Sequence, residues 1–181
     1  MTEPDGASPE VDPGDYPELL LLIDPNWEAT PEQPEPVLRV VVGAWVVHPD
    51  GSSGPFEPNP VYEPTTPGSP TDPVDAVLQL LARRDSSVEA LQSVLHDTVL
   101  GVALEADGSA VVTPAPDGVA SVVVATSPTH RRRMDVPGWR DVSVSELAAA
   151  LPADGVDVLL NPGGPASMRV LADVVREAAA G

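Results

Sequence analysis

Proline constrains the fold of this chain more than any other residue, because 16 of its 23 prolines fall within the first 75 residues. A proline inside a helix removes a backbone donor and clashes with the preceding turn, so this part is predicted to form strands, turns and extended segments. The same 75 residues contain fifteen acids and one basic residue, Arg39. The other 106 residues contain thirteen acids and eight arginines. The composition therefore divides the chain near residue 72.

Three regions follow from this division. Residues 1–15 carry almost no large apolar side chain and cannot offset the entropy cost of ordering, so they are predicted to form a disordered acidic tail. Residues 16–71 are predicted to form a small proline-rich β module that ends in a short linker. Residues 72–181 are long enough to enclose a core and are predicted to form the main domain.

The small module contains two apolar runs, 19–23 and 40–47, which are predicted to be strands. Gly43 within the second run indicates a bulge or a place where another backbone segment comes close. Between residues 54 and 64 four prolines forbid a helix. We predict an extended strap there, which the rings of Phe56 and Tyr62 fix to the main domain.

The main domain contains several local signals of secondary structure. Asp72 is a good N-cap because Pro73 and apolar residues at helical spacing follow it. Ser86-Ser-Val-Glu89 and Ser143-Val-Ser-Glu146 have the capping-box pattern, and Ala106-Asp-Gly108 is a hairpin signal. The signals predict helices from 72 and 86, strands over 98–104, 109–113 and 119–126, a short helix to 151, a strand over 156–160 and a terminal helix over 166–179. This order predicts an α+β fold with a mixed, largely antiparallel sheet, a β-meander, and helices packed on one side.

Charge and composition exclude several classes of partner and site. The formal net charge is −19, from 28 acids and nine arginines, so nucleic acid and anionic membranes would be repelled. The chain has no cysteine, which excludes disulfides and thiolate metal sites. Its apolar runs are too short to span a bilayer and its first residues are acidic, so a cytoplasmic protein without membrane insertion is expected.

No catalytic, cofactor-binding or metal-binding residue is predicted. His48, His96 and His130 have no partner at the spacing of a catalytic or metal-binding motif. The sequence also lacks the Gly-x-Ser-x-Gly elbow of the α/β-hydrolases. We therefore expect that the chain is not an enzyme and needs no cofactor. A substitution of His130 by alanine is expected to leave the fold and the function unchanged.

The tract Arg131-Arg-Arg133 is the only basic cluster in the sequence. Arg131, Arg132 and Arg133 either pair with this chain's own surplus carboxylates or dock an acidic partner segment or a phosphate. Trp139 follows the tract and is either a half-buried ring that pins the loop or an exposed interaction residue. These four residues are candidate interaction residues.

A second candidate lies in Asn161-Pro-Gly-Gly-Pro-Ala-Ser167, which the sequence predicts to join a strand to a helix. Free N–H groups at a helix start attract anions, so Asn161, Gly163, Gly164 and Ser167 are candidate anion-binding residues. The segment differs from a phosphate-binding P-loop because it lacks the Gly-Lys-Ser/Thr ending and contains two prolines. The alternative interpretation is a tight structural turn.

The motifs Thr126-Ser-Pro and Leu160-Asn-Pro-Gly-Gly-Pro-Ala-Ser167, spaced by a Val-Pro-Gly-Trp-Arg segment and a short helix, resemble the SseB N-terminal domain family over about residues 74 to 178. Upstream, Leu22-Ile-Asp-Pro25, Val42-Gly-Ala-Trp45 and Glu57-Pro-Asn-Pro-Val-Tyr-Glu-Pro64 are similar to the short module of actinobacterial proteins labelled type VII secretion system-associated. The resemblance implies an accessory role and brings no catalytic residues.

Together these observations predict a non-enzymatic accessory or adaptor protein associated with type VII secretion. It would bind a protein partner, such as a component of that system, through the arginine tract, Trp139 or the acidic proline-rich strap. The first alternative function is a regulatory domain that binds a small ligand or a phospho group at the Asn-Pro-Gly-Gly turn and the arginine cluster. The second alternative is a hydrolase that uses His130.

Overall fold

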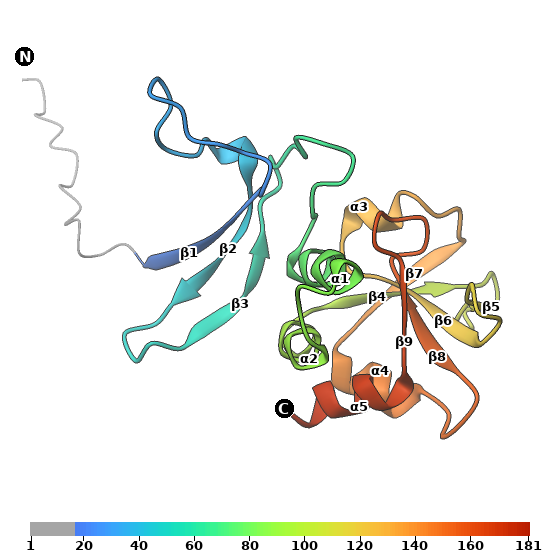
Figure 1. Ribbon diagram of the computed structural model, residues 1–181. Helices are drawn as coiled ribbons and strands as arrows, with labels where there is room; N and C mark the ends of the chain where they lie inside the picture. Colours follow the sequence, from blue (N-terminus) through green and yellow to red (C-terminus); the bar gives the residue numbers. More distant parts are fainter. Residues whose placement is uncertain (1–16) are drawn as a thin grey trace, which may run out of the picture.

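The computed structural model describes residues 17–181 and contains two separate β-sheets (Figure 1). A three-stranded sheet, here called the small sheet, is followed by a main domain with a six-stranded sheet and most of the helices. The α+β prediction is confirmed, since a small antiparallel sheet precedes a mixed sheet with helices. The acidic tail predicted at 1–15 lies outside the described residues.

The small sheet consists of β1 (Glu18–Ile23), β2 (Val41–Val47) and β3 (Ser53–Pro58), in that order and with antiparallel pairing. A short 3-10 helix, η2 (Leu38–Val40), leads into β2. Both strands predicted in the small module are present, and the first part of the predicted strap is β3. Its prolines are tolerated because β3 is an edge strand, whose outer backbone groups need no partner in the sheet.

Gly43 is the point at which β3 comes close to β2. A Cβ atom at this position would lie 2.3 Å from Phe56 Cζ and 2.4 Å from the backbone oxygen of Glu57. The ring of Phe56 also packs against Trp45, with the two centroids 4.8 Å apart. The close approach predicted at Gly43 is therefore confirmed, together with a register shift between β1 and β2 beside it.

The main domain begins with two helices and continues as alternating strands and helices. Its elements are α1 (Pro73–Arg83), α2 (Val88–His96), β4 (Leu100–Leu104), β5 (Val112–Pro114), β6 (Ala120–Ala125), α3 (Pro128–Arg131), β7 (Gly138–Val142), α4 (Val144–Ala150), β8 (Asp157–Leu160), β9 (Met168–Val170) and α5 (Ala172–Ala180).

The strand order of the large sheet is β7-β4-β6-β8-β9, and β5 pairs with β6. All pairs are antiparallel except β6 with β8, which run parallel. The sheet is thus more than the predicted meander, because β4 pairs with both β6 and β7. Strand β7, which contains Trp139, was predicted as a loop. It forms because its backbone pairs with all of β4 at the sheet edge.

The core lies between the large sheet and a layer formed by α1, α2, α4 and α5 (Figure 1). The helices bury apolar stripes, and β4, β6, β8 and β9 supply the facing side chains, as the predicted one-sided packing requires. The largest fully buried apolar side chains are Leu78, Leu95, Leu100 and Leu160. None of the helices within residues 17–181 is long and apolar enough to cross a membrane.

Helix caps set where the helices begin. The Asp72 side chain accepts a hydrogen bond from the backbone of Asp75, and Ser143 forms the predicted capping box with Glu146. The second helix begins one residue later than predicted, because Ser87 rather than Ser86 is the cap. Its side chain accepts from the backbone of Ala90.

The predicted terminal helix over 166–179 is wrong in its first turn and a half. Met168–Val170 is strand β9, which pairs antiparallel with β8, and α5 begins only at Ala172. The backbone of Ala172 donates to the side chain of Asp157 at 2.9 Å, which holds the helix start against β8. The segment 161–167 is therefore a hairpin turn between two strands.

Candidate functional site

A buried segment, residues 69–75, connects the small sheet to the main domain. All seven residues are buried, although the sequence predicted that a short linker ends here. Buried backbone and polar side chains require partners, and this segment finds them on both sides. We call residues 69–75 the joint.

On the small-sheet side, the joint is anchored through Asp24, whose side chain is 1% exposed. Its carboxylate accepts hydrogen bonds from the Thr65 hydroxyl at 2.9 Å, the Thr65 backbone at 3.0 Å and the Tyr62 hydroxyl at 3.2 Å. The amide of Asn26 bonds both Asp24 and the hydroxyl of Ser69. Burial by itself would raise the pKa of Asp24, but the backbone and hydroxyl hydrogen bonds together hold this pKa well below its usual range.

The lowered pKa of Asp24 predicts a specific dependence of stability on pH. A carboxylate with a depressed folded-state pKa contributes stability that is complete above its ordinary value of 3.8 and is lost as pH falls further. We expect Asp24→Asn to unfold at lower urea concentration than the wild type at neutral pH, with a difference that shrinks below about pH 4. Urea titrations of both proteins at several pH values test this. A difference that stays constant down to pH 3 would contradict it.

On the main-domain side, the joint is held by Thr71 and Asp72. The Thr71 hydroxyl lies 2.9 Å from the Ser127 hydroxyl, and the Thr126 hydroxyl donates to Asp72 at 2.7 Å. Asn161, fully buried, accepts from the Thr126 backbone at 2.9 Å. Burial raises the pKa of Asp72, and the hydrogen bonds from the Asp75 backbone and the Thr126 hydroxyl offset part of this effect.

His130 lies at the centre of this network and is entirely buried. Its Nε2 atom is 3.3 Å from Oδ2 of Asp75, which belongs to the joint. The other edge of the ring lies against Gly164, where a Cβ atom would approach His130 Cε1 to 2.9 Å. Neither ring nitrogen has a well-aligned hydrogen bond within the described residues. The ring therefore packs between α1, α3 and the Asn-Pro-Gly-Gly turn, with Nε2 next to the Asp75 carboxyl group.

The first arginine of the tract is bound within its own domain. Arg131 pairs with Asp141, and its guanidinium lies 5.6 Å from the centre of the Trp139 ring. It also covers Gly101, where a Cβ atom would lie 2.6 Å from Arg131 Nε. Arg131 thus follows the alternative in which the tract pairs with this chain's own carboxylates, and Trp139 is half-buried on β7.

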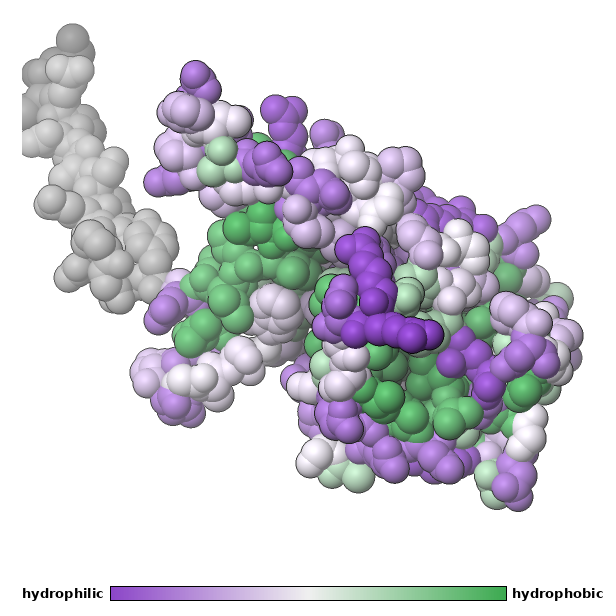
Figure 2. Space-filling view, in the orientation of Figure 1, coloured by the Kyte–Doolittle hydropathy of each residue, from purple (hydrophilic) through white to green (hydrophobic). Residues whose placement is uncertain are grey.

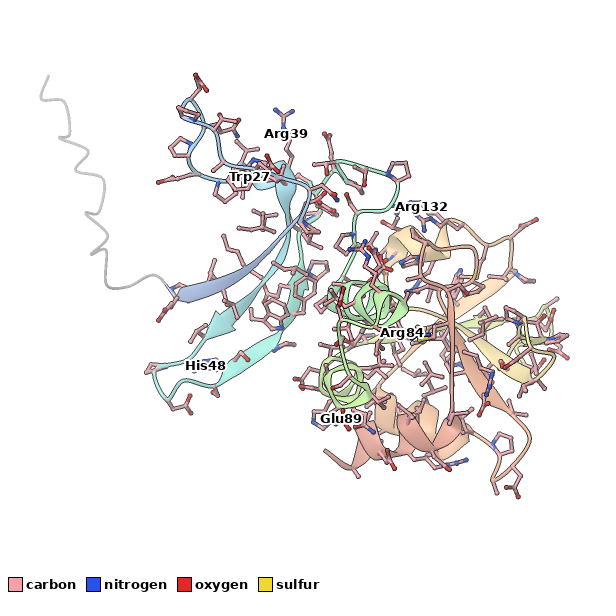
Figure 3. The ribbon with its side chains drawn as sticks, viewed as in Figure 1. Trp27, Arg39, His48, Arg84, Glu89 and Arg132 are labelled. Atoms are coloured by element: carbon pink, nitrogen blue, oxygen red, sulfur yellow. The ribbon has the colours of Figure 1, made fainter. Side chains whose placement is uncertain are left out.

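The other two arginines lie differently. Arg132 is exposed beside α3, on the side that faces the joint (Figure 3). Its one hydrogen bond within the described residues is to the hydroxyl of Thr129, at 3.0 Å. Arg133 is also exposed and forms no side-chain hydrogen bond or ion pair to the described residues. The tract is therefore not one uniform basic patch.

The Asn-Pro-Gly-Gly turn is not at a helix start, so the argument for an anion site there no longer holds. Asn161 has a φ of 50° and Gly163 a φ of 74°, left-handed values that serve the tight hairpin between β8 and β9. Gly164 makes room for His130, while Gly163 and Ser167 are exposed. The interpretation as a structural turn is the one that agrees with the fold.

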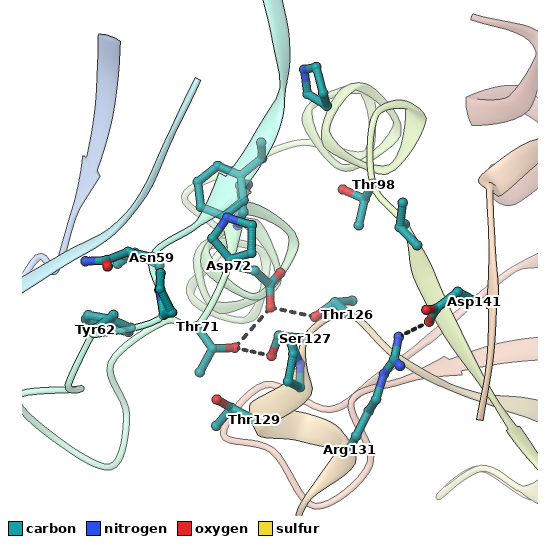
Figure 4. A pocket seen from close by; sticks show the side chains of 18 of the residues that line it. Asn59, Tyr62, Thr71, Asp72, Thr98, Thr126, Ser127, Thr129, Arg131 and Asp141 are labelled. Atoms are coloured by element: carbon teal, nitrogen blue, oxygen red, sulfur yellow. Dashed lines mark hydrogen bonds and ion pairs between the residues drawn. The ribbon is translucent and has the colours of Figure 1, made fainter. Parts of the chain in front are cut away.

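A cleft of about 590 Å³ lies between the small sheet and the main domain, next to the joint (Figure 4). Asn59 and Tyr62 line it from one side, and Thr126, Ser127 and Thr129 from the other. The remaining lining residues include Val42, Phe56, Pro58, Pro60, Thr71, Asp72, Thr98, Arg131, Arg132 and Asp141. Sequence reasoning singled out Phe56, Tyr62 and the arginines, but only as separate features. No local pattern indicated that they share one cleft.

The described residues contain no group of three or more histidine and acidic side chains placed to hold a metal ion. No protein-family model, curated protein or solved structure matches this chain.

Proposed function

We propose that this chain is a non-enzymatic adaptor that binds a basic protein partner along strand β1. The resemblance of the small module suggests that this partner is a component of a type VII secretion system. The observation that carries the proposal is the exposure of three consecutive leucines on an edge strand.

Within residues 17–181, strand β1 pairs with β2 alone, so its other backbone edge has no partner strand in this part of the chain. Leu19, Leu20 and Leu21 are 51%, 57% and 41% exposed. Figure 2 shows apolar residues gathered over the small sheet. Proteins usually protect such edges with lysine, proline or a covering segment, because an open apolar edge pairs readily with other strands. An extended partner segment would add a fourth strand there.

The charge around β1 favours a basic partner over a second copy of this chain. Residues 17–71 contain eight acids and one arginine, and Asp24 is the only one of these acids that is buried. A second copy would bring the same surplus of negative charge, and like charges across an interface lower the affinity. A segment that alternates apolar residues with flanking lysine or arginine matches both the leucines and the charge.

A catalytic role has weaker support. His130, the histidine with the most polar neighbours in sequence, is fully buried between α1, α3 and the turn. A general base must reach the proton that it removes, and this ring has no path to a substrate in the described fold. The alternative of a regulatory domain that binds a small ligand or phospho group relied on both the Asn-Pro-Gly-Gly turn and the arginine cluster, and the turn no longer supports it because no helix starts there.

The adaptor proposal is tested with two double variants of equal charge. Leu19→Lys/Leu21→Lys places two lysines on β1, whereas Leu38→Lys/Val61→Lys places two on exposed apolar sites of the same module outside β1. The partner is captured from the source cell with the full wild-type chain, identified and purified, and its affinity for each protein is then measured. We expect about a tenfold or greater loss for the β1 variant relative to its control.

The salt dependence and the oligomeric state complete this test. Affinity of the wild type should fall as salt rises, because electrostatic attraction between exposed charges is screened. Equal affinities of the two double variants would place the partner elsewhere and refute binding along β1. If the wild type sediments as a dimer and the β1 variant as a monomer, the occupant is a second copy, contrary to the proposal.

A further inference from the structure

The cleft between the small sheet and the main domain stays open because the joint fixes its two walls. The Tyr62 hydroxyl lies 2.9 Å from the backbone oxygen of Pro70, and the Thr71 hydroxyl lies 2.9 Å from that of Ser127 on the other side. Two partly apolar surfaces in water would otherwise close on each other. The cleft of about 590 Å³ is in the size range of sites that enclose small organic molecules.

The two walls of the cleft differ in chemistry. The small-sheet wall presents the rings of Phe56 and Tyr62 beside Pro58 and Pro60. The main-domain wall is rich in hydroxyl groups, from Thr71, Thr98, Thr126, Ser127 and Thr129. A flat apolar group fits the first wall. On the second wall Thr98 and Thr126 already donate within the protein, whereas the Thr129 hydroxyl accepts from Arg132 and can donate its own proton to a ligand oxygen.

The mouth of the cleft offers positive charge. Arg132 uses one of its five N–H groups on Thr129, and the others make no hydrogen bond to the described residues. Arg131 neutralises Asp141, another residue of the lining. Two further acids line the cleft without an arginine partner among the described residues: Asp97, which is exposed at the end of α2, and Asp72, whose pKa is raised by burial.

We propose that this cleft binds a small organic oxyanion, a ring that carries a carboxylate or a phosphate. The ring lies against Phe56 and Tyr62, and the oxyanion lies on the guanidinium of Arg132 and the hydroxyl of Thr129. Arginine is well suited to this contact because its planar fork bonds two oxygens of a carboxylate or phosphate at once. The site is distinct from the β1 edge and does not depend on the adaptor function.

Three small probes test the proposal on the full chain: benzoate, phenyl phosphate and phenol, which share a ring and differ in charge. Binding is followed by ligand-observed NMR titration and by the rise in unfolding temperature that a ligand of the folded state produces. We expect saturable binding of at least one of the two anions, about tenfold tighter than phenol. The tighter of the two anions identifies the group that the site prefers.

Two arginine variants locate the binding. Arg132→Gln should weaken the preferred anion about tenfold, whereas Arg133→Gln removes the same charge outside the cleft and should weaken it by about twofold or less. Both arginines are exposed, so both variants should keep the wild-type unfolding temperature without ligand. Thr129→Val should weaken the anion and leave phenol unchanged. The proposal is overturned if neither anion binds saturably, if phenol binds as tightly, or if both arginine variants bind alike.

Discussion

Replacing His130 by alanine is expected to lower the free energy of unfolding by about 3–5 kcal/mol, contrary to the silent substitution that the sequence predicts. The ring is 0% exposed and fills the space between Asp75 and Gly164. Its removal leaves a cavity between three elements and leaves the buried Asp75 carboxyl without its ring neighbour. Urea unfolding followed by circular dichroism measures the loss. The control is His48→Ala, which removes an exposed histidine and should change the free energy by about 0.5 kcal/mol or less.

A double-mutant cycle separates the cost of the cavity from the cost of losing the contact between the His130 ring and the Asp75 carboxyl group. Asp75→Asn should destabilise the wild type more than it destabilises His130→Ala, because the carboxyl group loses its partner in the second background. We expect a coupling of about 1 kcal/mol between the two positions. Strictly additive effects would mean that the ring acts only as packing. A His130→Ala protein as stable as the wild type would refute the structural role altogether.

Replacing Gly43 by alanine is expected to lower the free energy of unfolding by about 1–3 kcal/mol and to loosen β3. The new methyl group would lie 2.3 Å from the ring of Phe56 and 2.4 Å from the backbone oxygen of Glu57. A ring can turn away, but a backbone oxygen moves only with its strand, so β3 must shift. Limited proteolysis of the segment after β2, together with urea unfolding, measures the effect.

Gly54 supplies the matched control, because it lies in β3 of the same sheet and the nearest atom to an added Cβ is 3.7 Å away. Gly54→Ala should therefore change stability by about 0.5 kcal/mol or less. Equal effects of the two substitutions would show that the close approach at Gly43 does not constrain the sheet. Faster cleavage in β3 for Gly43→Ala alone would agree with the structure.

The features that were predicted from the sequence are those set by near neighbours in the chain. Asp72 caps α1 and Ser143 caps α4 because each side chain bonds a backbone group three residues on. The strands at 19–23 and 40–47 follow from runs of apolar and β-branched residues, and Gly43 signalled a close approach. These interactions join residues that are close in the sequence, so local composition and spacing are enough to predict them.

The missed features depend on partners far along the chain. Strand β7 was predicted as a loop because its five residues, two of them charged, have no strand pattern, and it is a strand only because β4 pairs with it. Strand β9 forms in the same way against β8. The segment 161–167 is therefore a hairpin turn, and the anion site predicted there has no helix start to form it. Backbone pairing with a distant strand outweighed local preference at both places.

The sequence by itself determined that an acidic, proline-rich β module precedes an α+β domain. Only the tertiary structure decided which polar residues are buried. Asp24, Asp72, Asp75, His130 and Asn161 are residue types that usually remain in water, and they are buried here because each meets partners in the assembled fold. Hydrogen bonds between residues more than 30 positions apart produce no pattern in the sequence from which they could be predicted. The joint, the cleft beside it and the division of the arginine tract into bound and open residues follow from those contacts alone.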